Sequence, residues 1–168
     1  MDIKDRIKTI LITIVCVLGI SFLVKGYMLI VHAKEPIIVT GHSMDPTFSN
    51  RQFLFVTKLN QKSLTGEYIT LNELKQGDVV IVKKSKTEKI IKRLIGLPGD
   101  IVVIDPNGSI YVNGEMYPTK ELLEDIPETI YYELDNDEYF ILGDNINYSL
   151  DSTETGPVSG TDIVAVYK

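Results

Sequence analysis

Hydrophobic and polar residues divide the chain into one long apolar segment and a later region of short apolar runs. Residues 10–24 carry no charge, and the apolar character resumes at residues 27–31 beyond Lys25. The uncharged stretch alone is short for a membrane span, which needs about 20 residues. A lysine near the end of a span can extend its amine to the interface, so the span can continue past Lys25. We therefore expect one transmembrane helix over residues 9–31.

From residue 36 to the end, the pattern is that of a β-rich domain. The apolar runs are short and rich in β-branched and aromatic residues, and Gly, Pro, Asn and Asp separate them. Many short strands at regular spacing are typical of antiparallel β-barrels and sandwiches. We expect a mostly β fold, an antiparallel barrel or sandwich over residues 36–168, with strands at residues 37–39, 53–56, 79–82, 90–91, 101–104, 110–112, 139–142 and 163–167.

Two further segments carry weaker patterns. Residues 60–75 are polar and predict a loop or surface hairpin with a short helix after Thr70. Residues 120–125 predict a single helical turn.

The charges around the apolar segment predict an orientation. Lys4, Arg6 and Lys8 precede it, and positive flanks favour the cytoplasmic side of a membrane. Residues 1–8 would then be cytoplasmic, and residues 36–168 would lie outside the cell on a single-pass anchor. A cleaved signal peptide ending at Ala33 is the alternative, and slow self-cleavage after Ala33 stays open. The length of the apolar stretch favours an uncleaved anchor.

Composition excludes several classes of function. The net charge of −6 argues against nucleic acid as the main partner. The single Cys16 lies in the apolar segment, so no intrachain disulfide is possible. No Lys or Arg occurs from residue 121 to residue 162, where acids recur, but no compact Asp-x-Asp-x-Asp-Gly loop is present. We therefore expect neither a metal nor a cofactor; the sequence leaves the oligomeric state open.

A candidate nucleophile lies just beyond the apolar segment. Ser43 stands between Gly41 and Pro46, on backbone that can turn sharply. A serine hydroxyl needs a neighbouring base, and the two histidines fit this role poorly. His32 is at the membrane edge, and His42 would point away from Ser43 on extended backbone.

A lysine can replace histidine as the base if its amine is neutral, which requires desolvation. Lys92 is the candidate, because Ile90 and Leu94 would share its face of a strand while Ile91 and Ile95 lie beside them. The lysines at positions 83, 84, 86 and 89 lie in a hydrophilic run and should be solvated.

Three motifs occur in order: Ser-Met-x-Pro-Thr at residues 43–47, Lys-Arg-x-x-Gly-x-Pro-Gly-Asp at residues 92–100, and Gly-Asp-Asn followed by Ser-x-Asp-Ser at residues 143–152. Together they resemble the type I signal peptidases, most closely the short Gram-positive kind with one membrane anchor. The resemblance covers roughly residues 5–166. It implies a membrane-anchored serine protease whose partners are membrane lipid and the signal peptides of exported preproteins.

The resemblance also implies roles for individual residues. Ser43 would be the nucleophile and its N–H an oxyanion donor, Lys92 the general base, and Ser149 the group that orients the lysine amine. Gly41 stands where some relatives carry a serine as second oxyanion donor. Arg93 and Asp144 match a structural ion pair. Pockets for small side chains at the −1 and −3 positions of the substrate would be lined by Val39, Met44, Phe48, Ile90 and Ile91, although core packing would explain these five residues equally well.

Two positions depart from the family pattern. Ile146 and Thr153 stand where arginines are usual. Asp151 therefore lacks its customary partner, and we expect it to be solvated or paired with a distant cation such as Arg93. On this interpretation Asp151→Asn would cost less than tenfold in rate, and less than Ser149→Ala.

Two other classes of function compete with the protease. A non-catalytic accessory factor for assembling surface structures would tolerate the weakened acidic turn, but it need not keep both Ser43 and Lys92. A LexA-like self-cleaving regulator shares serine-lysine chemistry on a related β fold. The apolar anchor, in place of a DNA-binding helix-turn-helix, argues against that alternative.

Overall fold

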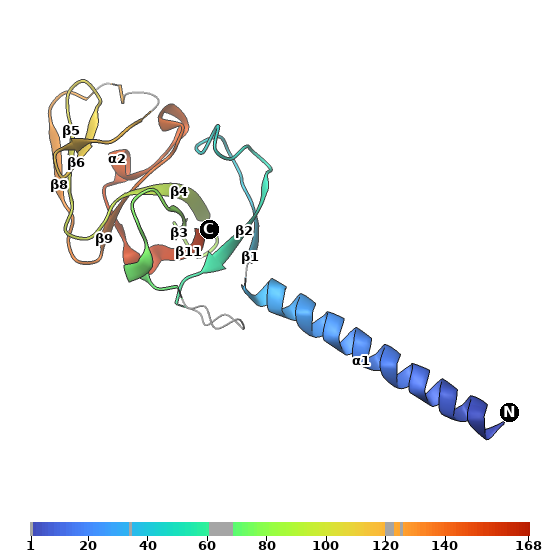
Figure 1. Cartoon of the computed structure of the whole chain (residues 1–168). Helices are drawn as coiled ribbons and strands as arrows, with labels where there is room; N and C mark the ends of the chain where they lie inside the picture. The colour runs from blue at the N-terminus through green and yellow to red at the C-terminus, as the bar shows by residue number, and fades with distance from the viewer. Residues whose placement is uncertain (1, 34, 61–68, 120–122, 125) are drawn as a thin grey trace.

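The computed structural model describes residues 2–33, 35–60, 69–119, 123–124 and 126–168. Helix α1 (Ile3–Ala33) extends away from a β-rich body that contains all the strands (Figure 1). Its segment Ile3–Tyr27 has a mean hydropathy of 2.5 and no buried residues, and it is long and apolar enough to cross a membrane. The predicted apolar helix therefore forms, and it continues beyond both predicted ends.

The β-rich body consists of two antiparallel sheets. The larger has seven strands in the order β1-β2-β11-β3-β4-β9-β10, and the smaller has four in the order β7-β6-β5-β8. The larger sheet comprises β1 (Glu35–Ile38), β2 (Phe53–Lys58), β3 (Val79–Lys83), β4 (Lys89–Gly96), β9 (Glu138–Leu142), β10 (Val158–Ser159) and β11 (Ile163–Tyr167). The smaller comprises β5 (Ile101–Ile104), β6 (Ile110–Val112), β7 (Glu115–Met116) and β8 (Ile130–Glu133).

The mostly β antiparallel fold is confirmed, but the larger sheet is open, since β1 and β10 are its edges among the described strands. Every predicted strand forms. Strands β7 and β10 were missed because two residues carry no periodic signal, and β8 because exposed and half-buried residues alternate in it.

Short helices complete the fold. The helix expected after Thr70 forms as η1 (Leu71–Glu73), and the others are η2 (Ile146–Tyr148), α2 (Ser152–Thr155) and η3 (Gly160–Asp162). Residues 61–68 of the expected polar loop, and residues 120–122 and 125 of the expected helical turn, lie outside the described residues.

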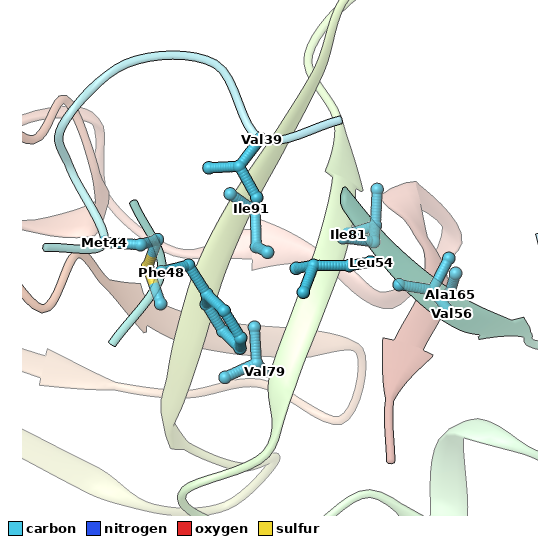
Figure 2. Close-up of a cluster of buried hydrophobic side chains, with 9 residues drawn as sticks. All are labelled: Val39, Met44, Phe48, Leu54, Val56, Val79, Ile81, Ile91 and Ala165. Atoms are coloured by element: carbon cyan, nitrogen blue, oxygen red, sulfur yellow. The ribbon is translucent and has the colours of Figure 1, made fainter. Parts of the chain in front are cut away.

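One hydrophobic cluster attaches the loop after β1 to the larger sheet. Met44 and Phe48 are only 1% and 5% exposed. Their side chains lie together, and the Phe48 ring points toward Val79 on β3 (Figure 2). The cluster consists of Val39, Met44, Phe48, Leu54, Val56, Val79, Ile81, Ile91 and Ala165. This packing fixes the segment on both sides of Ser43.

Strand β4 is held on both of its edges. Lys92 is opposite Val80 on β3, and Arg93 is opposite Leu142 on β9. A strand paired on both edges has little freedom to move, so the backbone that carries Lys92 and Arg93 is rigidly placed.

Candidate functional site

The loop after β1 and the middle of β4 bring Ser43 and Lys92 into contact. Lys92 Nζ donates a hydrogen bond to Ser43 Oγ over 2.8 Å. The Lys92 side chain is buried, with 3% of the residue exposed. A serine hydroxyl at hydrogen-bond distance from a desolvated amine has the geometry of an activated nucleophile and its base.

Burial lowers the pKa of the Lys92 amine below its usual value of 10.5, because the charged form loses hydration. The negative charges of Asp151 and Asp144 oppose this shift and raise the pKa. The positive charge of Lys84 acts with burial and lowers the pKa further. Burial is the largest of these effects, so the neutral amine is favoured relative to a solvated lysine.

The turn at Gly41 leads the chain from β1 to Ser43. Gly41 has φ of +90°, in the left-handed region that side chains rarely adopt, and its N–H donates to Asn50 Oδ1 over 3.2 Å. Among the described residues, the N–H of Ser43 has no hydrogen-bond acceptor. That N–H is therefore available to a bound carbonyl oxygen.

The loop that follows β9 holds the serine loop from the other side. Asn145 donates from its backbone N–H to Ser43 O over 3.0 Å and from Nδ2 to His42 O over 3.1 Å. A Cβ atom at Gly143 would lie 2.6 Å from Ser43 O and 2.2 Å from Ser149 Oγ, so only glycine permits this approach. Our sequence interpretation gave Gly143 and Asn145 no role, although both stand in the third motif.

Asp151 is the clearest correction to the sequence interpretation. It is buried, with 2% of the residue exposed, and is neither solvated nor paired with a distant cation. Its Oδ2 accepts hydrogen bonds from Ser149 Oγ and from the Gly143 N–H. Its Oδ1 accepts from the Thr153 N–H over 3.1 Å and from Thr153 Oγ1 over 2.8 Å. Neutral donors thus satisfy the carboxylate where an arginine is usual.

The two positions without arginine have different local explanations. Thr153 follows the N-cap of α2, and Asp151 as the N-cap accepts its N–H. A capping bond of this kind is worth about 1 kcal/mol. Ile146 is buried in a hydrophobic cluster with Ile95 and Leu142, so an apolar contact replaces a charge there.

The Ser149 hydroxyl donates a hydrogen bond to Asp151 Oδ2. The hydrogen bond found for Lys92 Nζ within the described residues goes to Ser43. The described residues thus show no hydrogen bond from Ser149 to the amine; the Asp151 carboxylate that Ser149 holds acts on Lys92 through its charge, which raises the pKa of the amine.

Arg93 and Asp144 form a two-bond ion pair beside the site. Arg93 Nε donates to Asp144 Oδ1 over 2.7 Å, and its terminal nitrogen donates to Oδ2 over 2.6 Å. A second terminal nitrogen donates to Gly77 O over 2.8 Å. The hydrogen bond with Asp144 raises the pKa of Arg93. The pair ties β4 to the Gly143–Asn145 segment.

A groove of about 240 Å³ runs beside Ser43 and Lys92, between β1 and the start of β4. Of the five predicted pocket residues, Val39, Ile90 and Ile91 line this groove. Met44 and Phe48 belong instead to the buried cluster under the serine loop. Among the described residues, no group of three His, Cys, Asp or Glu side chains could hold a metal ion.

A buried lysine beside a serine on an antiparallel β scaffold is typical of the serine-lysine hydrolases. The family model for signal peptidase, peptidase S26, matches residues 4–168. A signal peptidase I P of Bacillus subtilis subsp. natto is 35% identical over 178 residues, covering 98% of this chain and 86% of that protein. A signal peptidase I of Bacillus licheniformis is 34% identical, covering 88% of this chain and 76% of that protein.

A solved signal peptidase I from Enterococcus faecalis covers 57% of this chain and 97% of its own, with a TM-score of 0.47 and 22% identity. By the family model and the Bacillus relatives, the chain belongs to the signal peptidase family, peptidase S26.

The hydrogen bonds of Asp151 reverse the expectation drawn from sequence. Asp151→Asn should lower the cleavage rate more than tenfold and cost about 1–3 kcal/mol of stability, because an amide NH₂ would face buried donors. Ser149→Ala removes one of the four bonds and should cost less. Rates at one pH, with thermal melts of both variants, measure the difference. A larger loss for Ser149→Ala would mean that the serine acts on Lys92 directly.

Proposed function

We propose that this protein is a membrane-anchored serine endopeptidase that removes signal peptides from exported preproteins, with Ser43 as nucleophile and Lys92 as general base. The observation that carries the proposal is the 2.8 Å contact between Ser43 Oγ and the buried Lys92 amine. The relatives that share most of the chain are signal peptidases by name, which supports this substrate class.

In the proposed mechanism, neutral Lys92 takes the hydroxyl proton of Ser43 as Oγ attacks the scissile carbonyl carbon. The resulting oxyanion is stabilised by the N–H of Ser43. The C–N bond then breaks, and the Lys92 ammonium returns the proton to the leaving amine of the mature protein. Lys92 next deprotonates a water that attacks the acyl-enzyme, which releases the signal peptide carboxylate and restores the Ser43 hydroxyl.

The burial of Lys92 favours this chemistry. A base with its pKa lowered toward the working pH is more often neutral, and the burial of Lys92 acts in this direction. Ser149 serves as a positioning residue, because its hydrogen bond holds the Asp151 carboxylate, whose charge acts on the lysine. At position 41 no side chain supplies a second oxyanion donor, so any second donor is a backbone N–H.

The substrate would bind as an extended peptide in the groove beside β1. Because β1 is an edge of the sheet, its free backbone groups can pair with a strand. Val39, Ile90 and Ile91 would limit the −1 and −3 positions to small side chains. Met44 and Phe48 support the serine loop from beneath, and their effect on substrate choice would be indirect.

The proposal also gives the anchor an orientation in the membrane. Lys4, Arg6 and Lys8 would keep the N-terminus in the cytoplasm, and the β domain would lie outside, where exported proteins emerge. Neither the site geometry nor the relatives described above favour the non-catalytic accessory alternative.

Removing either member of the pair should abolish cleavage. Ser43→Ala removes the attacking atom and Lys92→Ala its base, and each should lower the rate at least about 10³-fold. Lys92→Arg should fail equally, since arginine stays charged near neutral pH. The assay uses the full chain in detergent with a model preprotein, and Lys75→Ala, which changes an exposed lysine, is the matched control. A Lys92→Ala variant that kept a tenth of the rate would refute the assignment.

The pH dependence should follow the Lys92 amine. The base is the neutral form, so kcat/KM should rise with pH as Lys92 loses its proton, with a midpoint below 10.5 because burial lowers the pKa. Lys84→Gln removes a charge that lowers this pKa and should move the midpoint to higher pH, whereas Lys75→Gln should not move it. A shift to lower pH in Lys84→Gln would contradict the role of Lys92.

The orientation predicts a protection pattern. Protease added to intact spheroplasts should digest residues 36–168 and leave an epitope at residues 1–8 intact. Lysed spheroplasts provide the control, in which the epitope should also be lost. Protection of the β domain in intact spheroplasts would overturn both the orientation and the export role.

A further inference from the structure

A second cavity, of about 200 Å³, adjoins the backbone of Ser43. Gly143 and Asp144 line it, and so does Thr47, four residues after the nucleophile. A Cβ atom at Gly143 would lie 2.6 Å from Ser43 O, so one wall of the cavity contacts the serine loop itself. None of the described residues that line this cavity also lines the groove. The active site therefore has a hollow besides the groove between β1 and β4.

Part of the lining of this second cavity is apolar. Ile95, Leu142 and Ile146 line it, and all three belong to one buried hydrophobic cluster. Ile146 stands where an arginine is usual in the family pattern. In this chain, an apolar surface thus occupies the place of a positive charge.

The polar part of the lining carries charges that are already paired. Arg93 and Asp144 form the two-bond ion pair, and the other terminal nitrogen of Arg93 donates to Gly77 O. The half-buried Tyr117 also lines the cavity, and burial raises the pKa of its phenol, which is therefore neutral near pH 7. The cavity consequently suits an uncharged side chain.

The strand pairing indicates which part of a substrate reaches this cavity. Residues 89–92 of β4 line the groove, whereas the pairing of β4 with β9 begins at Arg93, opposite Leu142. A peptide that leaves the groove past Ser43 therefore meets the segment that follows β9, which includes Gly143 and Asp144. The groove would hold the residues before the scissile bond, so the residues after it pass over the second cavity.

Side-chain alternation selects one position of the substrate. In an extended peptide, the side chains at −1 and +2 point to one side and the side chain at +1 points to the other. Ile91 and Arg93 are also two residues apart on a strand, so they share a face of β4. With the −1 side chain at Ile91, the +2 side chain lies at Arg93, where the second cavity begins.

We propose that the second cavity is a specificity site for the +2 residue of the substrate, and that it takes an uncharged aromatic or large aliphatic side chain. Water occupies about 30 Å³ per molecule in the liquid, so the cavity has the volume of about seven waters, or of one large side chain. Tyr117 and Ile146 determine the preference, because they form the ring wall and the apolar wall. The inference deepens the proposed peptidase function and rests on it.

The test compares model preproteins that share one signal peptide and differ only after the scissile bond. With the full chain in detergent, kcat/KM for phenylalanine at +2 should exceed that for alanine about tenfold, since filling an apolar pocket favours the larger side chain. Glutamate at +2 should be cleaved no faster than alanine. Phenylalanine moved to +1 should give no gain, because that side chain points away from the cavity.

Variants of the protein assign the preference to the cavity. Tyr117→Ala should lower the phenylalanine-to-alanine ratio about fivefold, because the aromatic wall is lost. Tyr131→Ala is the matched control, since Tyr131 on β8 is 57% exposed, and it should leave the ratio unchanged. Ile146→Arg restores the residue usual in the family and should also lower the ratio. Thermal melts identify folded variants, and Tyr117→Ala decides the outcome if Ile146→Arg does not fold.

Equal kcat/KM for phenylalanine and alanine at +2 would overturn the inference, as would an equal gain from phenylalanine at +1. An equal fall of the ratio in Tyr117→Ala and Tyr131→Ala would overturn it too. In each of these cases the preproteins are still cleaved, so the peptidase function stands. Absence of cleavage of every preprotein would instead refute the peptidase function, and this inference with it.

Discussion

The burial of one lysine amine is the constraint on which the rest of the site depends. A charged amine in the middle of a paired strand would be costly unless it lost its proton or gained an acceptor. Ser43 Oγ is the acceptor, and it reaches Lys92 because the serine loop is held from below by Met44 and Phe48 and from above by Asn145. Packing and backbone hydrogen bonds thus bring a loop and a strand into contact. The proposed chemistry follows from that contact.

The turn at residues 149–153 shows that a buried carboxylate can be satisfied by donors other than the arginine that is usual in the family. Four neutral hydrogen bonds surround the Asp151 carboxylate, and no buried side-chain nitrogen or oxygen in the described part of the chain lacks a partner. The charge of Asp151 raises the pKa of the Lys92 amine, and an arginine beside the carboxylate would offset part of that effect. The nearby Arg93–Asp144 pair is a separate element, which braces β4 against the loop that follows β9.

Helix α1 and the β domain meet at the end of the larger sheet where Glu88 and Lys89 line the groove. This arrangement results from the register of β1, β2, β11, β3 and β4, which aligns Glu35, Lys58 and Lys89.

The sequence by itself determined the apolar helix, the mostly antiparallel β fold and the pair Ser43 and Lys92. The helix and the fold rest on local patterns, an uncharged apolar run and alternating strands between turns. The pair rests on a lysine among isoleucines and on the resemblance of three motifs to those of the type I signal peptidases. Only the tertiary structure decided how Asp151 is satisfied, because its donors Gly143, Ser149 and Thr153 are brought together by a turn and a helix cap that the residue types do not reveal. Likewise, whether an apolar residue lines a groove or fills the core depends on what packs against it. For this reason Val39 and Ile91 reach the groove, while Met44 and Phe48 support it from within.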